Sequence, residues 1–192
     1  MKFLCEIITF ILLLPIFIFY YFFCWILGHR RAFADFSQMM SLIPGIFGEF
    51  FRRVFYRTVL PRCEKNSCIS FGVIFSHPTA EIGENVYIGP YCILGDITLE
   101  KDVLLASGVS VANGTKQHGT RRLDIPIREQ PGEYPRIIIG EDSWVGERAT
   151  VLANIGKHCI IGAGSLVVEP IPDYAIAVGV PAKVIKFRNQ AE

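Results

Sequence analysis

The sequence lacks an excess of charge of either sign: 19 lysines and arginines stand against 18 aspartates and glutamates, a formal net charge of +1 over 192 residues. No global field attracts nucleic acid, and we expect no nucleic-acid partner. The six cysteines include no CxxC pair of the metal-binding type, and we expect no metal. We interpret them as reduced packing residues of a cytosolic domain, with a disulfide between the nearby Cys63 and Cys68 as the less favoured alternative.

Charged residues are also missing from Ile7 to Leu27, where only Thr9 is clearly polar. At about 1.5 Å per residue this stretch reaches about 30 Å, enough to cross the hydrocarbon core of a bilayer. A cleaved signal peptide would have a shorter apolar core and a small-residue cleavage site. This run instead ends in aromatic and then basic residues, with Trp25, Arg30 and Arg31 among them. Residues 1–31 are therefore predicted to be a retained membrane anchor.

The basic cluster after this segment is stronger than Lys2 before it, which places the C-terminal body on the cytoplasmic side of the membrane. Pro15 lies near the middle of the run and would kink a helix. A re-entrant hairpin that never crosses is therefore the alternative to a spanning helix, and both leave the body cytoplasmic.

Residues 32–64 contain a second segment with membrane character. From Phe47 to Val59 the apolar residues recur at helical spacing, while Arg52, Arg53 and Arg57 occupy the other side. We predict an in-plane amphipathic helix whose basic face contacts anionic headgroups. The alternative is a helix packed on the body of the domain itself.

Beyond residue 64 the sequence repeats every six residues, with an aliphatic residue at position one and a small or β-branched residue at position five. Hexads start at Ile82, Ile88, Leu94, Leu99, Leu105, Val111, Ile139, Val145, Val151, Ile155 and Ile161, with weaker candidates at Ile69 and Phe75. This period fits neither an isolated helix nor hairpins. It is typical of a parallel β-helix, in which each hexad forms one side of a coil, and it predicts about five triangular coils within residues 65–192.

The pattern resembles that of the hexapeptide acyltransferases, the left-handed parallel β-helix family that includes galactoside, maltose and xenobiotic acetyltransferases. The resemblance covers about Ile69 to Phe187. The left hand rests on the resemblance alone, because the general rule for parallel crossovers predicts the opposite hand. We expect a mainly β protein: a left-handed parallel β-helix of hexapeptide repeats, preceded by a membrane helix and an amphipathic interfacial helix.

The repeat stops at residues 113–136. A long loop that interrupts so regular a repeat structure is more often functional than accidental. A lone histidine in a loop is usually only solvated, but the resemblance implies that His118 is the general base. A neutral imidazole with a pKa near 6.5 suits the role, because a hydroxyl is a weak nucleophile near neutral pH. Its orienting partner stays open among Asp124, Glu129, Glu133 and a backbone carbonyl.

The resemblance further implies acetyl-CoA, or another acyl-CoA, as cosubstrate. The residues that match the family's coenzyme A elements are Trp144, Ala163, Gly164, Lys183 and Lys186. A tryptophan that only packs at the rim is the plain alternative for Trp144. Relatives often carry Thr-Lys where this chain has Val168-Glu169, which puts one phosphate contact in doubt.

We therefore expect a membrane-associated O-acyltransferase at the bacterial inner membrane, with its catalytic domain on the cytoplasmic side. It would move an acetyl or similar short acyl group to a hydroxyl of a glycan or lipid-linked glycan, in contact with membrane lipids. The resemblance implies a homotrimer, because in relatives the active site lies between adjacent β-helices.

Three alternatives stay open. They are N-acylation of an amino sugar, a non-catalytic β-helix scaffold and a γ-class carbonic anhydrase. The last needs three zinc-binding histidines, and its His-x4-His pair is missing from this sequence.

Overall fold

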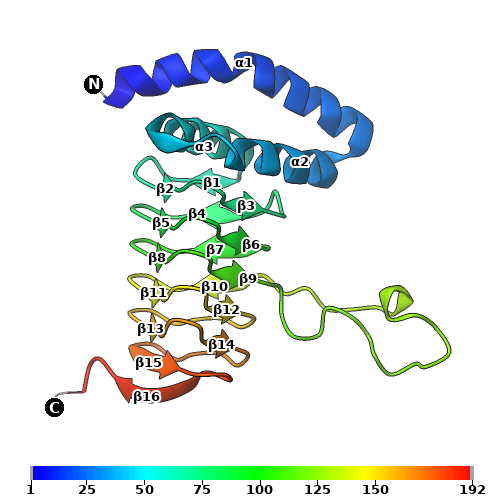
Figure 1. Ribbon diagram of the computed structural model, residues 1–192, viewed down its shortest axis with the longest axis vertical. Coiled ribbons are helices and arrows are strands. Elements are labelled where there is room, and N and C mark those ends of the chain that lie inside the picture. Colours follow the sequence, from blue (N-terminus) through cyan, green and yellow to red (C-terminus); the bar gives the residue numbers. More distant parts are fainter. Residues whose placement is uncertain (1, 191–192) are drawn as a thin grey trace.

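The computed structural model describes residues 2–190, which form a helical cap followed by a parallel β-solenoid of about six turns (Figure 1). The cap contains α1 (Lys2–Leu27), α2 (His29–Ser41) and α3 (Gly45–Val59). In Figure 1, α2 and α3 lie on the first turn of the solenoid and α1 crosses over both. The C-terminal end of the described residues lies at the opposite end of the stack.

Three sheets form the sides of the solenoid, and their strands are parallel except for the antiparallel pair β15 and β16. The four-stranded sheet contains β1 (Arg62–Cys63), β4 (Glu81–Ile82), β7 (Ile97–Leu99) and β10 (Ile137–Ile139). The seven-stranded sheet contains β2 (Cys68–Ile69), β5 (Tyr87–Ile88), β8 (Leu104–Leu105), β11 (Trp144–Val145), β13 (Ile160–Ile161), β15 (Ala175–Val178) and β16 (Lys183–Phe187). The five-stranded sheet contains β3 (Ile74–Phe75), β6 (Ile93–Leu94), β9 (Ser110–Val111), β12 (Thr150–Val151) and β14 (Leu166–Val167).

The hexad pattern forms the core as predicted. Each residue that opens a predicted hexad is at most 3% exposed, including the weaker candidates Ile69 and Phe75. The small residues at position five are buried as well, among them Cys92 and Cys159, and all six cysteines are free. The stack is one turn longer than expected, because β1–β3 form a regular first turn and Ile171 extends the last one through a bridge to Ile155.

The glycine at position two of a hexad allows neighbouring turns to approach closely. A Cβ on Gly83 would lie 2.8 Å from the backbone of Glu100 in the next turn, and one on Gly89 would lie 2.8 Å from that of Ala106. Backbone atoms cannot move aside as a flexible side chain does, so a larger residue would separate the turns.

The helix predicted to touch headgroups is α3, and the expectation for Arg52 is wrong. Its side chain is 1% exposed and covers the end of the solenoid. Nε donates to the carbonyl oxygen of Ile69 at 2.8 Å, and Nη1 donates to that of Ile43 at 2.7 Å. The Ile69 carbonyl is in the first turn and has no further turn to bond to, while the Ile43 carbonyl lies in the link between α2 and α3, so a buried cation supplies the donor to both.

The rest of α3 also packs on the protein's own body. Phe55 is fully buried, with its ring 6.0 Å from that of Phe17 in α1. Tyr56 packs on Phe75 of the first turn, with 4.8 Å between ring centroids. The alternative given above, a helix packed on the domain, therefore describes most of α3.

One helical segment of the described chain, Cys5–Leu27, is long and apolar enough to cross a membrane by length and composition. It belongs to α1, which continues through Pro15 as one helix. Its buried stripe is Leu13, Phe17 and Tyr20, at the spacing of a single helical face. This stripe faces α2 and α3, as the contact between Tyr20 and Phe36 at 5.4 Å shows.

Candidate active site

The solenoid is interrupted by one long loop between β9 and β10. Strand β9 ends at Val111 on the five-stranded sheet, and β10 begins at Ile137 on the four-stranded sheet. Between them the chain leaves the solenoid at the corner joining these sheets and projects far from it (Figure 1). A short 3-10 helix, η1 (Ile127–Glu129), lies in the outer part of this loop.

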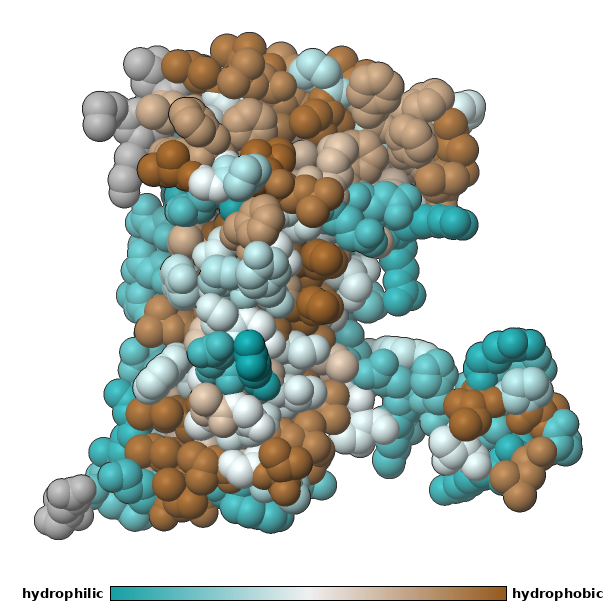
Figure 2. Space-filling model, viewed as in Figure 1, coloured by the Kyte–Doolittle hydropathy of each residue, from teal (hydrophilic) through white to brown (hydrophobic). Residues whose placement is uncertain are grey.

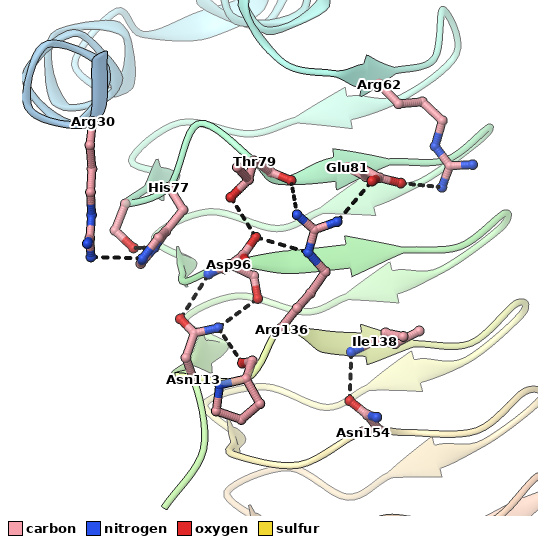
Figure 3. A network of polar contacts seen from close by, with 12 residues as sticks. Arg30, Arg62, His77, Thr79, Glu81, Asp96, Asn113, Arg136, Ile138 and Asn154 are labelled. Atoms are coloured by element: carbon pink, nitrogen blue, oxygen red, sulfur yellow. Dashed lines mark hydrogen bonds and ion pairs between the residues drawn. The ribbon is translucent and has the colours of Figure 1, made fainter. Parts of the chain in front are cut away.

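Asn113 fixes the start of the loop, and this start and the end at Arg136 are called the two roots of the loop. It is 4% exposed, and its side chain joins three backbone groups (Figure 3). The Asp96 N–H donates to Asn113 Oδ1 at 2.9 Å. Asn113 Nδ2 donates to the carbonyl oxygens of Asp96 at 2.8 Å and Pro135 at 2.9 Å. One buried amide therefore ties both ends of the loop to the preceding turn of the solenoid.

Arg136 fixes the second root. Its guanidinium donates to Glu81 Oε1 at 2.9 Å, lies 3.2 Å from Asp96 Oδ1, and donates to the Thr79 carbonyl oxygen at 2.9 Å (Figure 3). Sequence reasoning assigned no role to Asn113 or Arg136. Their position at the two limits of the interruption is the signal that could have found them.

The segment that carries His118 is held against the returning limb of the loop. The Glu133 N–H donates to the Lys116 carbonyl oxygen at 2.8 Å. Gly132 lies so close to the backbone of Gln117 that a Cβ there would come within 1.9 Å of its carbonyl oxygen. The two limbs thus touch through their backbones directly beside His118, which limits the movement of its Cα.

The predicted carboxylate partners do not contact the His118 ring. Asp124 is engaged by Arg122, whose Nε donates to its Oδ1 at 3.0 Å, and this hydrogen bond lowers the pKa of the Asp124 carboxyl. Glu129 lies 3.7 Å from Arg128. Within residues 2–190 the imidazole makes no hydrogen bond, and its ring contact is with Tyr134, whose ring is nearly perpendicular to it with 6.4 Å between the centroids. The imidazole is exposed and free to accept a proton from an incoming hydroxyl.

The hollow around His118 is lined entirely by the loop. Gln130 organises it from inside: it is 6% exposed and donates from Nε2 to the Arg122 carbonyl oxygen at 2.7 Å. Lys116, Arg121 and Arg122 line the hollow together with Glu129 and Glu133, so its lining carries charges of both signs.

The residues predicted to hold coenzyme A lie on another side of the solenoid. Trp144 is 50% exposed on the outer face of β11. Strand pairing runs in one row from Trp144 through Ile160 and Ile176 to Lys186, so Trp144 and Lys186 are three strand spacings apart, about 14 Å. Both side chains are exposed. Lys183 is also exposed and begins β16, which lies two strands from β13 in the sheet.

Ala163 and Gly164 form the exposed corner that follows β13, and Gly164 has a φ of 67°. The Ala163 backbone lies close above the preceding turn, because a Cβ on Gly146 would come within 2.5 Å of its N atom. One chain therefore does not bring the predicted base and the predicted cofactor residues together, since none of the latter lines the hollow around His118.

The other histidines have structural partners. His158 Nδ1 lies 2.9 Å from Asp142 Oδ2, and the ring of Tyr174 stacks on it at 5.0 Å. His77 Nε2 accepts from Arg30 of α2 at 2.9 Å (Figure 3). Among the described residues, no group of three or more His, Cys, Asp or Glu side chains could hold a metal ion.

Comparison with known proteins matches the solenoid on both sides of the loop. A family model described as the hexapeptide repeat of succinyl-transferase matches residues 80–112 and 136–169, and so leaves out the loop that carries His118. The matched segments are the regular turns identified from the hexads.

Two curated relatives extend this similarity. A putative lipopolysaccharide biosynthesis O-acetyl transferase, WbbJ of Escherichia coli strain K12, is 33% identical over 125 residues, covering 62% of each chain. A galactoside O-acetyltransferase of Lactococcus lactis is 32% identical over 135 residues, covering 59% of this chain and 65% of the relative. The chain thus spans less than two thirds of the length of these relatives.

Among solved structures, a galactoside acetyltransferase in complex with coenzyme A matches with a TM-score of 0.71 and 23% identity, over 85% of this chain and 82% of that one. At this identity the likeness concerns the fold. It covers most of the stack of turns described above.

Proposed function

The chain belongs to the hexapeptide-repeat acetyltransferase family, and from that premise we propose that it transfers an acetyl or similar short acyl group from acyl-CoA to a hydroxyl of a glycan or glycolipid precursor. The observation that carries the proposal is His118, an exposed imidazole held by backbone contacts on the long loop that interrupts the repeat. The similarity to curated O-acetyltransferases supports the reaction class.

In the proposed reaction, neutral His118 accepts the proton of the acceptor hydroxyl as its oxygen attacks the thioester carbonyl carbon. The C–S bond then breaks, and the imidazolium returns the proton to the leaving thiolate. The products are the ester and free coenzyme A. Because the ring lacks a carboxylate partner, its orientation depends on how firmly the two loop limbs hold its backbone.

Coenzyme A fits the outer face of the seven-stranded sheet and the corner after β13. Trp144 offers an exposed aromatic surface, and Ala163-Gly164 exposes backbone groups that can pair with the pantetheine arm. Lys183 and Lys186 lie at the far end of this face, where a cation attracts phosphate. When bound, the acyl thioester supplies the electrophilic carbon.

A complete site then needs a second copy of the chain. His118 projects from one corner of the solenoid, while Trp144 and Ala163 lie elsewhere on its surface. We infer a homotrimer in which the loop of one copy reaches the cofactor face of the next, an arrangement that closes under cyclic symmetry.

This interface can be tested by mixing two inactive variants, His118→Ala and Trp144→Ala, before reassembly. Random mixing should restore about one quarter of wild-type turnover, because each site draws its two residues from two different copies. Absence of any recovery, with mixed oligomers shown by mass spectrometry, would place both residues in one chain or in none.

The acceptor is proposed to be a lipid-linked glycan on the cytoplasmic side of the bacterial inner membrane. The support is the long apolar helix before the catalytic body and the similarity to a relative described as acting in lipopolysaccharide biosynthesis. A helix in the membrane would confine the enzyme to the surface that carries such an acceptor.

The decisive variant for the reaction is His118→Ala. We expect turnover to fall by about 10²–10⁴ with unchanged assembly, the usual effect of removing a general base. Arg128→Ala is the matched control, because that side chain is 83% exposed on the same loop. Release of free thiol from acetyl-CoA in the presence of membrane glycolipid extract measures both, and near-normal turnover of the His118 variant would refute the assignment.

A further inference from the structure

The helix α1 packs against α2 and α3 along most of its length, from Glu6 to Phe23. At one end, Glu6 lies 3.1 Å from Arg57 and 3.8 Å from Arg53 of α3. At the other end, the ring of Phe23 lies 6.1 Å from that of Phe36 in α2. The buried stripe described above fills the space between these points. A spanning helix that only ended at the domain would touch it at one end.

The opposite face of α1 is open and apolar. Large side chains there are strongly exposed, including Ile11 at 57%, Ile18 at 69% and Trp25 at 83%. No charged residue occurs from Ile7 to Leu27, so the flanks of the helix are apolar too. Figure 2 shows apolar residues gathered over the cap above a more polar solenoid. A face this long and free of charge is not one that water covers in a soluble protein.

We propose that α1 lies flat within one leaflet of a phospholipid bilayer, with its outer face in the acyl chains and the solenoid axis along the membrane normal. This placement deepens the membrane association proposed above and rests on it. It differs from both topologies that the sequence left open, because α1 neither crosses nor folds back as a hairpin, although like the hairpin it keeps both of its ends on one side of the membrane.

The charges around α1 support this position over a crossing one. A helix perpendicular to the membrane would draw α2 and α3 into the hydrocarbon, together with Arg30, Arg31 and the buried polar end of the solenoid. With α1 in the plane of the membrane, these residues stay at the level of the headgroups. Two arginines neutralise Glu6. Arg30 and Arg31, both exposed just beyond the end of α1, outnumber the exposed Asp35 of α2, so the net charge offered to anionic lipid there is positive.

Tryptophan depth measurements test the proposal, because the chain has only two tryptophans, Trp25 and Trp144. Positions 11, 18 and 25 lie seven residues apart and so share one helical face. Single-tryptophan proteins are made by Trp144→Phe alone, and by Ile11→Trp or Ile18→Trp combined with Trp25→Phe and Trp144→Phe. Each is added to phosphatidylcholine–phosphatidylglycerol vesicles with phosphatidylcholine brominated at different acyl positions.

The in-plane helix predicts the same depth for all three positions. A crossing helix predicts a depth gradient, with position 18 near the bilayer centre and positions 11 and 25 shallower by about 10 Å, from 7 residues at about 1.5 Å each. That gradient would overturn the in-plane placement but leave membrane association standing. Absence of quenching at all three positions would overturn both. A Trp25→Phe protein serves as the control, and if its Trp144 were quenched as strongly as Trp25 is, that result would also count against the proposal. Circular dichroism checks that each variant is folded.

Discussion

Replacing Asn113 by alanine should loosen the loop that carries the proposed base, although it substitutes no residue near His118. The substitution removes three hydrogen bonds in a site that is 4% exposed. At about 0.5–1.5 kcal/mol net for each bond, the loss sums to about 2–4 kcal/mol of unfolding free energy. The Asp96 N–H and the Pro135 carbonyl lose their partner, so the two roots no longer hold each other. Because small misplacements of a catalytic group are costly, we expect kcat to fall about 10–100-fold.

Urea unfolding in detergent measures the first effect and thiol release from acetyl-CoA measures the second. Asn154→Ala is the matched control: Asn154 is exposed and accepts a single hydrogen bond, from the Ile138 N–H at 2.9 Å (Figure 3). It should lose no more than about 1 kcal/mol and keep its turnover. If Asn113→Ala matches this control in both measurements, the roots do not depend on the amide. A KM for acyl-CoA that rises while kcat is unchanged would likewise refute a role in placing the base.

Four further outcomes are expected. Arg52→Ala should lower the unfolding free energy by about 3 kcal/mol or more, measured by urea, because the Ile69 carbonyl at the end of the solenoid and the Ile43 carbonyl between α2 and α3 lose a buried charged donor. Gly132→Ala should reduce kcat with little change in stability, because a Cβ cannot fit against Gln117, and unchanged kcat would show that the limbs can separate freely. Burial, and then the charge of Arg30, lowers the pKa of His77 below 6.5. The unfolded chain therefore takes up a proton at this residue before the folded chain does, and the melting temperature should fall as pH is lowered from about 7. His77→Gln should make the melting temperature less dependent on pH in this range. With α1 in the leaflet, the loop that carries His118 lies about 30 Å from the membrane, a distance made up of two helix-packing layers and three strand spacings. Lipid-linked acceptors with several sugars should therefore react faster than those with one.

Much of the fold is local in origin and could be predicted. A hexad places its aliphatic residue inward wherever the period holds, so Ile88 and Val145 could be assigned to the core without knowing their neighbours. The same regularity made its interruption visible, and the limits at residues 113 and 136 agree with the strands that end at Val111 and begin at Ile137. The length and composition of α1 were equally evident from the sequence.

Contacts between distant residues could not be predicted in this way. Arg52 lies on the polar side of an amphipathic pattern, which suggested solvent or headgroups, yet the open end of the solenoid needs donors that no further strand provides. Arg136 meets Glu81 across 55 positions of sequence, and such a distance carries no periodic signal.

The sequence by itself determined that this chain has an apolar helix, a hexapeptide solenoid and one long loop with a histidine. The tertiary structure alone decided that α1 lies along the cap, that Asn113 and Arg136 hold the loop, and that His118 and Trp144 project from different sides of one chain. The physical reason is that periodicity records which face of an element is buried. What that face is buried against depends on how the finished elements pack together.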